Sequence, residues 1–431
     1  ACRELGISTV AIYSEADKYA LHTQMADEAV CVGGPQSKDS YLNMTNILSA
    51  CVLTGCEGIH PGFGFLSENP KFAKMCEECN IKYIGPDYKI IELMGNKAKA
   101  REVMKKANVP VVPGYEGEIT SVSQALEIAK EIGFPVMIKA AAGGGGKGIR
   151  IVNEEGEFEH NYNAAKLESK ACFSDDRIYI EKFIQKPRHI EFQILADEYG
   201  NTIHLGEREC SLQRNNQKVL EEAPSTFLNP KLREKMGEVA KCAAKAVNYK
   251  NAGTIEFLVD KDCNFYFMEM NTRIQVEHPI TEMVTGVDIV KEQLKIASGK
   301  KLDLIQDDIC ISGNAIECRI NAEDTDNNFR PSPGLIKELY IPSGPGVRVD
   351  SAIYSGYEIP PYYDSMIGKM ITYGATRDEA IIKMKRALGE FAIGGVKTNI
   401  DFQYSILNNI DFVKGNYDTS FIAEKLVRNN A

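Results

Sequence analysis

Two strand-like segments that lie close together, residues 253–260 and 265–271, constrain the fold of this chain more than any other feature. Both are rich in aromatic, β-branched and other apolar residues, which is typical of buried β-strands. Only four residues separate them, so the pattern predicts an antiparallel hairpin. The simplest register places Asp260 opposite Phe265 across the turn.

This register has a chemical consequence, because it places Glu256 directly opposite Glu269, with Asn271 on the same face as Glu269. Two like charges opposite each other destabilise a sheet unless something neutralises them. Carboxylate and amide oxygens are ligands that suit Mg²⁺, which also binds nucleotide phosphates. The neighbouring Phe and Met residues argue against the alternative of a solvated acidic face. We therefore expect these three side chains to hold a divalent cation.

The remaining apolar patterns predict a chain of alternating strands and helices. In the first ninety residues this alternation indicates a mostly parallel sheet covered by helices. The predicted strands are residues 9–13, 28–32, 58–60, 82–84, 135–139, 148–152, 177–181, 189–196 and 202–208. The predicted helices are residues 41–53, 69–79, 88–107, 123–132, 288–298, 377–391 and 399–408. We therefore expect an α/β and α+β protein with three parts, residues 1–94, 95–312 and 313–431, and a smaller subdomain at about 112–184.

Residues 140–148 (AAAGGGGKG) form a glycine-rich loop between two predicted strands. No Gly-Lys-Ser/Thr sequence closes the loop, and a dinucleotide-binding fingerprint needs a helix where residues 149–152 predict a strand. Glycine N–H groups can close onto phosphates, and flexible glycines suit a lid. Lys139, directly before the loop, would add a positive charge. The pattern favours a phosphate-binding lid over a flexible hairpin without a ligand.

A dense set of polar residues follows the acidic hairpin. Arg273 offers a planar guanidinium that matches a small oxyanion. Glu277 is a candidate general base for a weak acid that must lose a proton before it attacks a phosphate. Lys218 is a candidate for a further cation. Taken alone, the segment also fits an ordinary salt-bridged loop.

The formal net charge of −10 at pH 7 argues against broad binding to nucleic acid or to an anionic membrane. No apolar run reaches the ~18 residues that a membrane helix needs. The 12 cysteines are scattered along the chain, which is typical of reduced thiols in the cytoplasm. We therefore expect a cytoplasmic protein that binds neither nucleic acid nor membranes.

Five motifs together carry a resemblance to a known family. They are HPGFGFLSEN (60–69), the glycine loop after Lys139, EMNTRIQVEH (269–278), ECRINAED (317–324) and PPYYDSMIGK (360–369). Over nearly its whole length the chain resembles biotin carboxylase, the ATP-grasp subunit of bacterial acetyl-CoA carboxylase. The resemblance implies an N-terminal Rossmann-like (pre-ATP-grasp) domain, an ATP-grasp domain with a glycine-rich lid and a C-terminal biotin carboxylase domain.

The resemblance also implies a role for each site residue. The residues that would bind ATP are Lys97, Lys139, Gly145, Gly146, Glu181, Lys182, Ile184, His189, Gln213, Leu258, Met268 and Phe421. Those that would bind bicarbonate are Lys218, Arg273, Gln275 and Val276. Those that would hold Mg²⁺ or Mn²⁺, with two sites expected, are Glu256, Glu269 and Asn271. Glu277 would remove the proton of bicarbonate, and Arg319 would stabilise the enolate of biotin.

The implied reaction is the first half-reaction of acetyl-CoA carboxylase, which yields malonyl-CoA for fatty acid synthesis. Bicarbonate attacks the γ-phosphate of ATP to give carboxyphosphate and ADP, and the CO₂ released carboxylates biotin. The chain has no biotinylation motif, so the biotin would come from a biotin carboxyl carrier protein. Carboxyltransferase subunits would complete the enzyme. A homodimer is also implied, with Arg348 and Glu4 as candidate contacts.

Two positions depart from the family pattern: Asn216 stands where histidine is frequent, and Phe63 replaces a common tyrosine. Residues 1–6 are typical of the last turn of a helix closed by Gly6, so we expect the natural protein to begin upstream. Three other functions stay open. They are the N-terminal part of a larger biotin-dependent carboxylase of the pyruvate or propionyl-CoA type, another ATP-grasp ligase, and a nucleotide-binding regulatory module.

Overall fold

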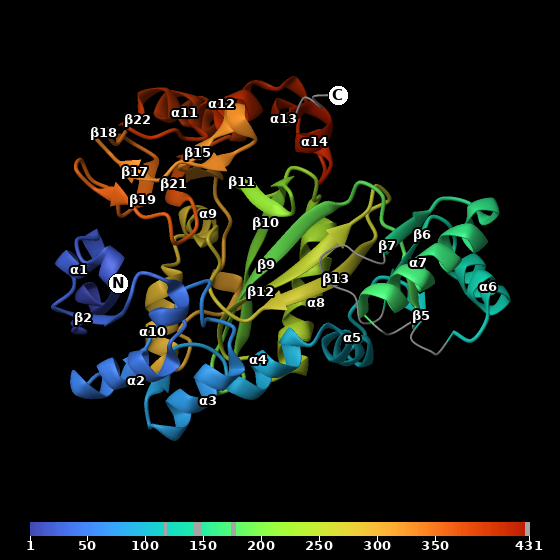
Figure 1. Cartoon of the computed structure of the whole chain (residues 1–431), viewed down its shortest axis with the longest axis horizontal. Helices are drawn as coiled ribbons and strands as arrows, with labels where there is room; N and C mark the ends of the chain where they lie inside the picture. Colours follow the sequence, from blue (N-terminus) through green and yellow to red (C-terminus); the bar gives the residue numbers. More distant parts are fainter. Residues whose placement is uncertain (116–118, 141–148, 174–177, 427–431) are drawn as a thin grey trace. The chain divides into compact units, whose positions relative to one another are not determined.

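The computed structural model of the chain describes residues 1–115, 119–140, 149–173 and 178–426 (Figure 1). Contacts divide the chain into two compact units. The first unit contains Ala1–Val109, Arg188–Phe257 and Glu269–Ala431, and the second contains Pro110–Pro187 and Leu258–Met268. The glycine-rich residues 141–148, which include Gly145 and Gly146, lie outside the described residues. The boundaries proposed near residues 94 and 312 stay predictions.

The N-terminal part contains the expected strands and helices but not the expected single sheet. Its strands form two separate parallel pairs, β1 (Val10–Ser14) with β2 (Glu28–Gly33), and β3 (Gly58–Ile59) with β4 (Lys82–Tyr83). The helices are α1 (Leu21–Met25), α2 (Met44–Leu53) and α3 (Pro70–Glu78). The prediction of one sheet was wrong because β3 and β4 are only two residues long. Within the described residues, their hydrogen bonds reach each other but not β1 or β2.

The long helix predicted near residue 100 is two helices, α4 (Tyr88–Gly95) and α5 (Lys97–Lys106). The break lies at Asn96, whose backbone is extended (φ −93°, ψ 100°). Its side-chain Oδ1 accepts a hydrogen bond at 3.1 Å from the N–H three residues later. Asparagine is favoured at this capping position because it satisfies a donor that the helix leaves unpaired. The break makes Lys97 the first residue of α5.

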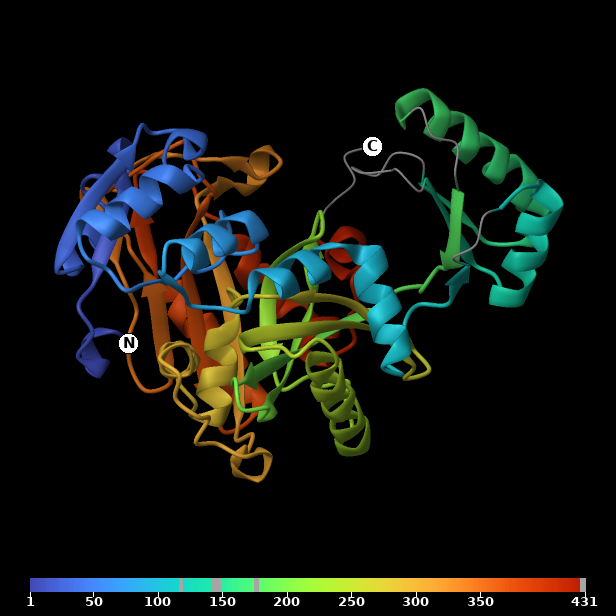
Figure 2. The ribbon, with the colours of Figure 1, turned by 90° about the horizontal axis from the view of Figure 1, so that it is seen from below.

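The second unit is a four-stranded antiparallel sheet with two helices. Its strands, in sheet order, are β5 (Gly114–Tyr115), β8 (Ile178–Lys182), β6 (Val136–Ala140) and β7 (Ile149–Val152). Helices α6 (Val122–Ile132) and α7 (Phe158–Phe173) pack together against this sheet (Figure 2). Ile128, Phe158 and Ile180 belong to its buried core. The two strands expected on either side of the glycine-rich residues are therefore confirmed, whereas the subdomain bounds near residues 112 and 184 stay predictions.

The largest sheet has eight strands. In sheet order they are β13 (Phe265–Asn271), β12 (Asn251–Val259), β9 (Arg188–Ala196), β10 (Thr202–Arg214), β11 (Gln217–Ala223), β14 (Asn314–Asn321), β21 (Met366–Gly374) and β19 (Val347–Ser351). β11 was not predicted, because its sequence QKVLEEA places two glutamates in a row and glutamate is depleted in strands. It pairs with β10 on one side and β14 on the other, and so joins the middle of the chain to its C-terminal part.

A two-residue turn at Asn215 and Asn216 connects β10 to β11. Both residues have positive φ angles, 50° and 62°, as a type I′ hairpin turn requires. Asparagine tolerates this left-handed conformation better than most residues do. The asparagine at position 216 therefore suits the backbone of this turn.

Helices cover both faces of the C-terminal half of the large sheet. One face packs against α11 (Arg377–Glu390) and α12 (Ile400–Asn408) through a core that includes Ile316, Cys318, Met370, Met384 and Leu388. The other face packs against α9 (His278–Thr285), which was not predicted, through a cluster that includes Ala223, Ala315 and Ile371. Alternate residues of a strand point to opposite faces. Glu221, Glu317 and Arg319 therefore lie on the face that α9 covers.

Several short elements complete the chain. The remaining strand pairs are β15 (Glu323–Asp324) with β16 (Arg330–Pro331), β17 (Gly334–Leu335) with β20 (Glu358–Ile359), and β18 (Glu338–Tyr340) with β22 (Ala392–Gly394). The remaining helices are α8 (Pro230–Ala246), α10 (Ile289–Ala297), α13 (Ile410–Val413) and α14 (Phe421–Lys425). The chain starts with a 3₁₀ turn, Arg3–Leu5, that ends at Gly6 with φ 71°, as expected. In the part of the chain that the structure describes, every helix is too short or too polar to cross a membrane.

The hairpin between β12 and β13 closes in a different register from the one expected. The backbone N–H of Asp260 donates to the carbonyl of Asn264 at 2.9 Å, not to Phe265. Cys263, at φ 64°, adds one residue to the turn. A left-handed residue at this position is typical of a turn that ends in a β-bulge. The predicted pairing of Asp260 with Phe265 was therefore wrong, and the pairing of Glu256 with Glu269 no longer follows from the turn.

The packing on α11 yields a test of the core. Met384 is 0% exposed, whereas Ile382 on the same helix is 66% exposed. We expect Met384→Ala to lower the free energy of unfolding by about 2–5 kcal/mol, because it leaves a cavity in the core. The matched variant Ile382→Ala is expected to change it by less than about 0.5 kcal/mol. Urea unfolding followed by circular dichroism measures both, and equal losses would contradict this assignment of the core face.

Candidate active site

Lys218 lies at the centre of a buried cluster of acidic side chains. Its Nζ donates to oxygens of Glu191 (2.5 Å), Glu277 (2.7 Å), Glu256 (2.9 Å) and Gln275 (3.0 Å). An ammonium has three N–H donors, so these four acceptors must share them. Burial alone lowers the pKa of Lys218, but the three carboxylates outweigh burial and raise that pKa well above its ordinary value. Lys218 is therefore a permanent positive charge, and the structure brings three other predicted site residues around it, Glu256, Gln275 and Glu277.

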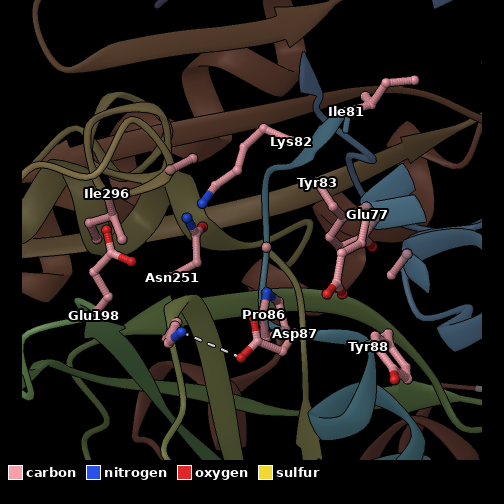
Figure 3. Close-up of a pocket in the computed structure, with 14 residues that line it drawn as sticks. Glu77, Ile81, Lys82, Tyr83, Pro86, Asp87, Tyr88, Glu198, Asn251 and Ile296 are labelled. Atoms are coloured by element: carbon pink, nitrogen blue, oxygen red, sulfur yellow. Dashed lines mark ion pairs between the residues drawn. The ribbon is translucent and has the colours of Figure 1, made fainter. Parts of the chain in front are cut away.

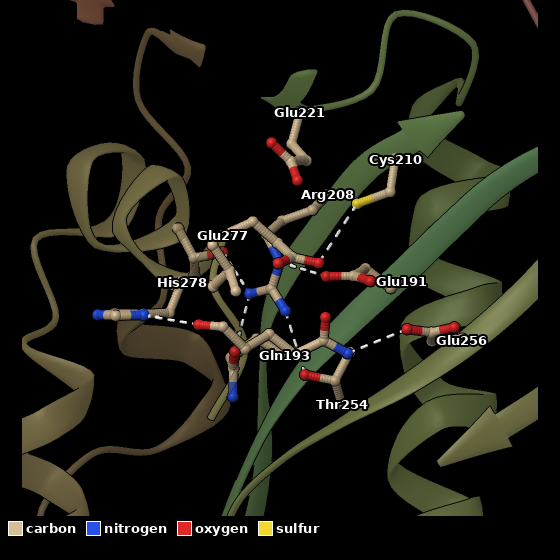
Figure 4. Close-up of polar contacts among 12 residues, drawn as sticks. Glu191, Gln193, Arg208, Cys210, Glu221, Thr254, Glu256, Glu277 and His278 are labelled. Atoms are coloured by element: carbon tan, nitrogen blue, oxygen red, sulfur yellow. Dashed lines mark hydrogen bonds and ion pairs between the residues drawn. The ribbon is translucent and has the colours of Figure 1, made fainter. Parts of the chain in front are cut away.

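Arg208 supports this cluster from β10, and neither Arg208 nor Glu191 was predicted. The Arg208 Nε donates to Glu191 Oε1 at 2.5 Å. Its other nitrogens donate to Gln193 (2.8 Å) and Thr254 (3.1 Å), which Figure 4 shows beside it. A further bond goes to Thr281 (3.0 Å). A fully buried guanidinium is stable only when its donors are satisfied in this way. The sequence did carry a signal, because residues 189, 191 and 193 are polar at alternate positions of a strand whose other residues after Arg188 are apolar.

Glu277, the predicted general base, lies between two cations. Its Oε1 accepts from Lys218, and its Oε2 accepts from Arg319 Nη2 at 2.9 Å. The side chain is 0% exposed at the start of α9. Burial alone raises the pKa of Glu277, but Lys218, Arg319 and Arg208 outweigh burial and hold that pKa below its ordinary value. Glu277 is therefore an ionised carboxylate with no competing proton at neutral pH.

Arg319 connects the base to a second buried carboxylate. Its Nε donates to Glu221 Oε1 at 2.6 Å, while its Nη2 contacts Glu277. Across β14 and β21, Arg319 lies opposite Lys369, whose Nζ donates to the carbonyl of Val276 at 2.6 Å. Lys369 thus anchors the segment that leads into Glu277. The structure therefore links the predicted residues Arg319 and Val276 to the Lys218 cluster.

Glu256 and His189 form one edge of the cluster. The resemblance predicts that a nucleotide binds on this side. His189 Nε2 lies 3.0 Å from Glu256 Oε2, and Gln213 Nε2 lies 2.9 Å from His189 Nδ1. Burial alone raises the pKa of Glu256, but Lys218 and His189 outweigh burial and hold that pKa well below its ordinary value. Glu256 is therefore ionised and offers oxygens that a hard divalent cation prefers.

The other two predicted metal ligands lie beside two further cations. Glu269 Oε1 lies 3.5 Å from Asn271 Nδ2, and Glu269 Oε2 lies 3.3 Å from Lys97 Nζ. Arg273 Nη2 donates to Asn271 Oδ1 at 2.8 Å, and Arg273 Nε donates to Glu68 at 2.9 Å. Glu68 was not assigned a role, although it lies within the HPGFGFLSEN motif. Two carboxylates and an amide oxygen make a donor set that fits Mg²⁺ or Mn²⁺.

The other predicted nucleotide residues divide between the two units. In the second unit, Lys139 and Glu181 form an ion pair, and Lys182 Nζ donates to the carbonyls of Gly133 (2.8 Å) and Phe134 (2.9 Å). Burial lowers the pKa of Lys182. Ile184 and Leu258 are half-buried, and Met268 is exposed. In the first unit, Phe421 is buried with its ring centre 6.1 Å from that of Tyr417.

A separate cavity of about 250 Å³ lies in the first unit, away from these residues (Figure 3). Its wall comes from α3, β4 and the segment before α4, together with residues near Glu198, Asn251 and Ile296. Lys250 and Asp87 at its edge form an ion pair of 3.4 Å. None of its lining residues is a predicted site residue, so the cavity is not part of the candidate active site.

Comparison with known proteins identifies the family. Three family models match successive parts of the chain: the biotin carboxylase N-terminal domain (residues 1–91), the carbamoyl-phosphate synthase L chain ATP binding domain (residues 96–305) and the biotin carboxylase C-terminal domain (residues 317–424). Biotin carboxylase 1 of Bacillus subtilis is 59% identical over 423 residues, which is 98% of this chain and 94% of the relative. A pyruvate carboxylase subunit of Methanothermobacter thermautotrophicus is 54% identical, and the match covers 98% of this chain and 86% of the relative.

Solved structures agree with these matches. The biotin carboxylase domain dimer of Hydrogenobacter thermophilus 2-oxoglutarate carboxylase, in complex with MgADP, ADP and bicarbonate, has a TM-score of 0.88 and 52% identity. The match covers 98% of this chain and 93% of that one. The α/β and α+β fold in three parts that the sequence predicted is confirmed. The chain belongs to the biotin carboxylase family of ATP-grasp ligases.

Proposed function

We propose that this chain uses ATP to carboxylate biotin with bicarbonate, through carboxyphosphate, and that the biotin is attached to a separate carrier protein. One observation carries the proposal: Glu277 is a fully buried, ionised carboxylate held between Lys218 and Arg319. A base in this position serves a reaction in which a small acid must be deprotonated next to fixed positive charges.

Bicarbonate is such an acid. In the proposed site, Arg273 and Lys218 attract it, and Gln275 and the backbone of Val276 orient it. Its negative charge beside these two cations has two effects. The cations lower the pKa of bicarbonate, and the new anion raises the pKa of Glu277 from its depressed value. The two pKa values thus approach each other, which permits transfer of the proton to Glu277.

Deprotonated bicarbonate then attacks the γ-phosphorus of ATP. A new oxygen–phosphorus bond forms, the bond to the β–γ bridging oxygen breaks, and ADP leaves with carboxyphosphate as the other product. Lys97 and the Lys139 side chain are proposed to hold the phosphates. Glu256, Glu269 and Asn271 are proposed to hold Mg²⁺ or Mn²⁺. The bound metal supplies positive charge that neutralises the phosphate oxygens.

Carboxyphosphate releases CO₂ and phosphate, and the phosphate accepts the N1′ proton of biotin. The N1′ nitrogen of biotin then attacks CO₂. Arg319 is proposed to stabilise the negative charge that develops on the ureido oxygen. A proton on Glu277 weakens its contact with Arg319 Nη2, because the acceptor loses its charge. The first step therefore frees the guanidinium for the second.

The proposed partners are a biotin carboxyl carrier protein and the carboxyltransferase subunits of acetyl-CoA carboxylase, in the cytoplasm. A homodimer is proposed on the basis of the related dimer. Within this chain, Arg348 contacts Glu282 (2.7 Å) and Asp350 (2.8 Å), and Glu4 contacts Lys291. A second candidate is the same half-reaction in a pyruvate or 2-oxoglutarate carboxylase, which the names of two relatives favour.

The direct test is ADP release from MgATP and bicarbonate, with and without free biotin. Stimulation by biotin that also depends on bicarbonate supports the proposal. A protein that binds ATP but shows no such stimulation would instead favour another ligase or a regulatory module. Reconstitution with candidate carriers and carboxyltransferases then separates the acetyl-CoA, pyruvate and 2-oxoglutarate alternatives.

We expect Glu277→Gln to reduce biotin-dependent ADP release by about 10²–10⁴-fold, because the amide cannot accept the proton. Binding of ATP, measured by calorimetry, should stay within about twofold, since Glu277 is not one of the proposed nucleotide ligands. The matched control is Glu238→Gln on α8, where the native side chain is exposed and pairs only with Lys241 among its described contacts. Equal activity of the two variants would remove Glu277 from the mechanism.

We expect Lys218→Met to move the acid limb of the pH–rate profile towards higher pH. Lys218 is the first of the cations that lower the pKa of Glu277, and burial raises that pKa once Lys218 is absent. In the native protein Glu277 stays ionised, so it should contribute no inflection between about pH 6 and 8. The profile of residual ADP release in Lys218→Met measures the shift, with Lys245→Met as control, because Lys245 is an exposed lysine of α8. If the acid limb lay at the same pH in the native protein, in Lys218→Met and in the control, Lys218 would not be the cation that lowers the pKa of Glu277.

A further inference from the structure

Two buried carboxyl groups behind Arg319 have no role in the proposed reaction. Glu221 on β11 and Glu317 on β14 lie directly opposite each other in the antiparallel ladder. Both side chains are 0% exposed. Only Glu221 Oε1 has a hydrogen bond, from Arg319 Nε at 2.6 Å. Glu221 Oε2 and both oxygens of Glu317 accept none from any residue that the structure describes.

Two ionised carboxylates at these opposite positions would lower the stability of the sheet. Residues directly opposite in an antiparallel pair have Cβ atoms about 4.5–5.5 Å apart, and like charges there destabilise the sheet. Burial of an unpaired charge costs still more, and a carboxyl group avoids that cost when it keeps its proton. One proton divided between the two carboxyls leaves a single negative charge, which Arg319 neutralises.

The surrounding charges agree with one proton on the pair. The titratable groups that interact electrostatically with the pair are Arg319 and Cys318 on β14, Lys369 on β21, Lys218 on β11, Cys210 on β10, and Glu277 at the start of α9. The Lys369 ammonium is bonded to the Val276 carbonyl and not to Glu317. Burial raises the pKa of Glu221 to about 7 and the pKa of Glu317 well above its ordinary value, although Arg319 and Lys369 oppose this.

We propose that Glu221 and Glu317 share one proton, held mainly by Glu317, and that the charge remaining on Glu221 positions Arg319 against Glu277. Glu221 is a positioning residue, because it contacts Arg319 and does not touch the reacting groups, whereas Glu317 only holds the proton. Glu221 holds one edge of the guanidinium through Nε, which fixes the direction in which Nη2 reaches Glu277. Loss of the shared proton would add a second anion behind Arg319 and draw it away from the base. The effect on turnover rests on the proposed function, whereas the shared proton does not.

Thermal unfolding as a function of pH tests the shared proton without any turnover. A glutamate whose folded pKa is raised gives stability that is complete below its unfolded pKa and is lost as pH rises towards the folded pKa. Glutamine at position 317 resembles the protonated acid at every pH. The unfolding temperature of Glu317→Gln should therefore equal that of the native protein near about pH 4, close to the unfolded pKa of glutamate, and exceed it by about 1–3 °C near pH 8.

The matched control is Glu222→Gln, the next residue of the same strand as Glu221. Glu222 is also buried, but it accepts hydrogen bonds from Arg377 (2.6 Å) and from Tyr417. Glutamine there weakens the ion pair and should lower the unfolding temperature at both pH values. A Glu317→Gln protein that behaves like Glu222→Gln, or a difference from native that does not grow with pH, would overturn the shared proton.

Steady-state kinetics test the positioning of Arg319. We expect Glu221→Gln to lower kcat for biotin-dependent ADP release about tenfold with an unchanged KM for ATP, because the anchor of Arg319 loses its charge. Glu317→Gln should keep kcat within about twofold at pH 7, and Glu221→Asp should recover part of the loss.

The outcomes separate the two proposals. Equal kcat losses in Glu221→Gln and Glu317→Gln, or no loss in Glu221→Gln, would overturn the positioning role. Absence of biotin-dependent turnover in the native protein would count against the proposed function alone. In that case the unfolding series still supports or overturns the shared proton.

Discussion

The site depends on the compensation of buried charge around Lys218. Three carboxylates that water does not reach surround one ammonium, and two guanidinium groups complete the balance from either side. Removal of one partner from such a cluster leaves an uncompensated charge in a medium of low polarity, which is strongly destabilising. The same compensation keeps Glu277 ionised although it is fully buried. Both the stability of the fold and the proposed chemistry therefore require that each of these buried charges keeps its partner of opposite charge.

The pairing of β11 with β14 in the large sheet positions the charged side chains of the site. β11 carries both Lys218 and Glu221, and β14 carries both Glu317 and Arg319. The pairing of these two strands, Glu221 with Glu317, sets where the guanidinium begins, and α9 covers the same face and starts at Glu277. A shift of β14 by one residue against β11 would turn Glu317 and Arg319 to the other face of the sheet. The pairing of β11 with β14 therefore joins the middle and C-terminal parts of the chain and also positions Arg319, which contacts Glu277.

Many of the helices and strands could be predicted, because the spacing of apolar residues in the sequence matched the element that each segment forms. β9, α6 and α12 lie within two residues of their predicted bounds, since their apolar residues recur with the period of the element. α9, which is short and begins with His278-Pro279, was missed, and so was the acidic strand β11. The predicted register of the turn at Cys263 was also wrong, because nothing in the local sequence indicates that this cysteine adopts a left-handed backbone conformation.

The sequence by itself determined the family, the three-part fold and the chemical types at the site, because Glu277, Arg273 and Arg319 lie in motifs whose spacing is specific. We did not identify Glu191, Arg208 or Glu317 from the sequence, because the polar positions of β9, β10 and β14 do not by themselves show which charges they contact. Only the tertiary structure decided which charges are neighbours. The reason is physical: the pKa of a buried group depends on what lies within a few ångströms of it. For Glu277 those neighbours come from residues 208, 218 and 319, which the chain brings together only when the sheet forms.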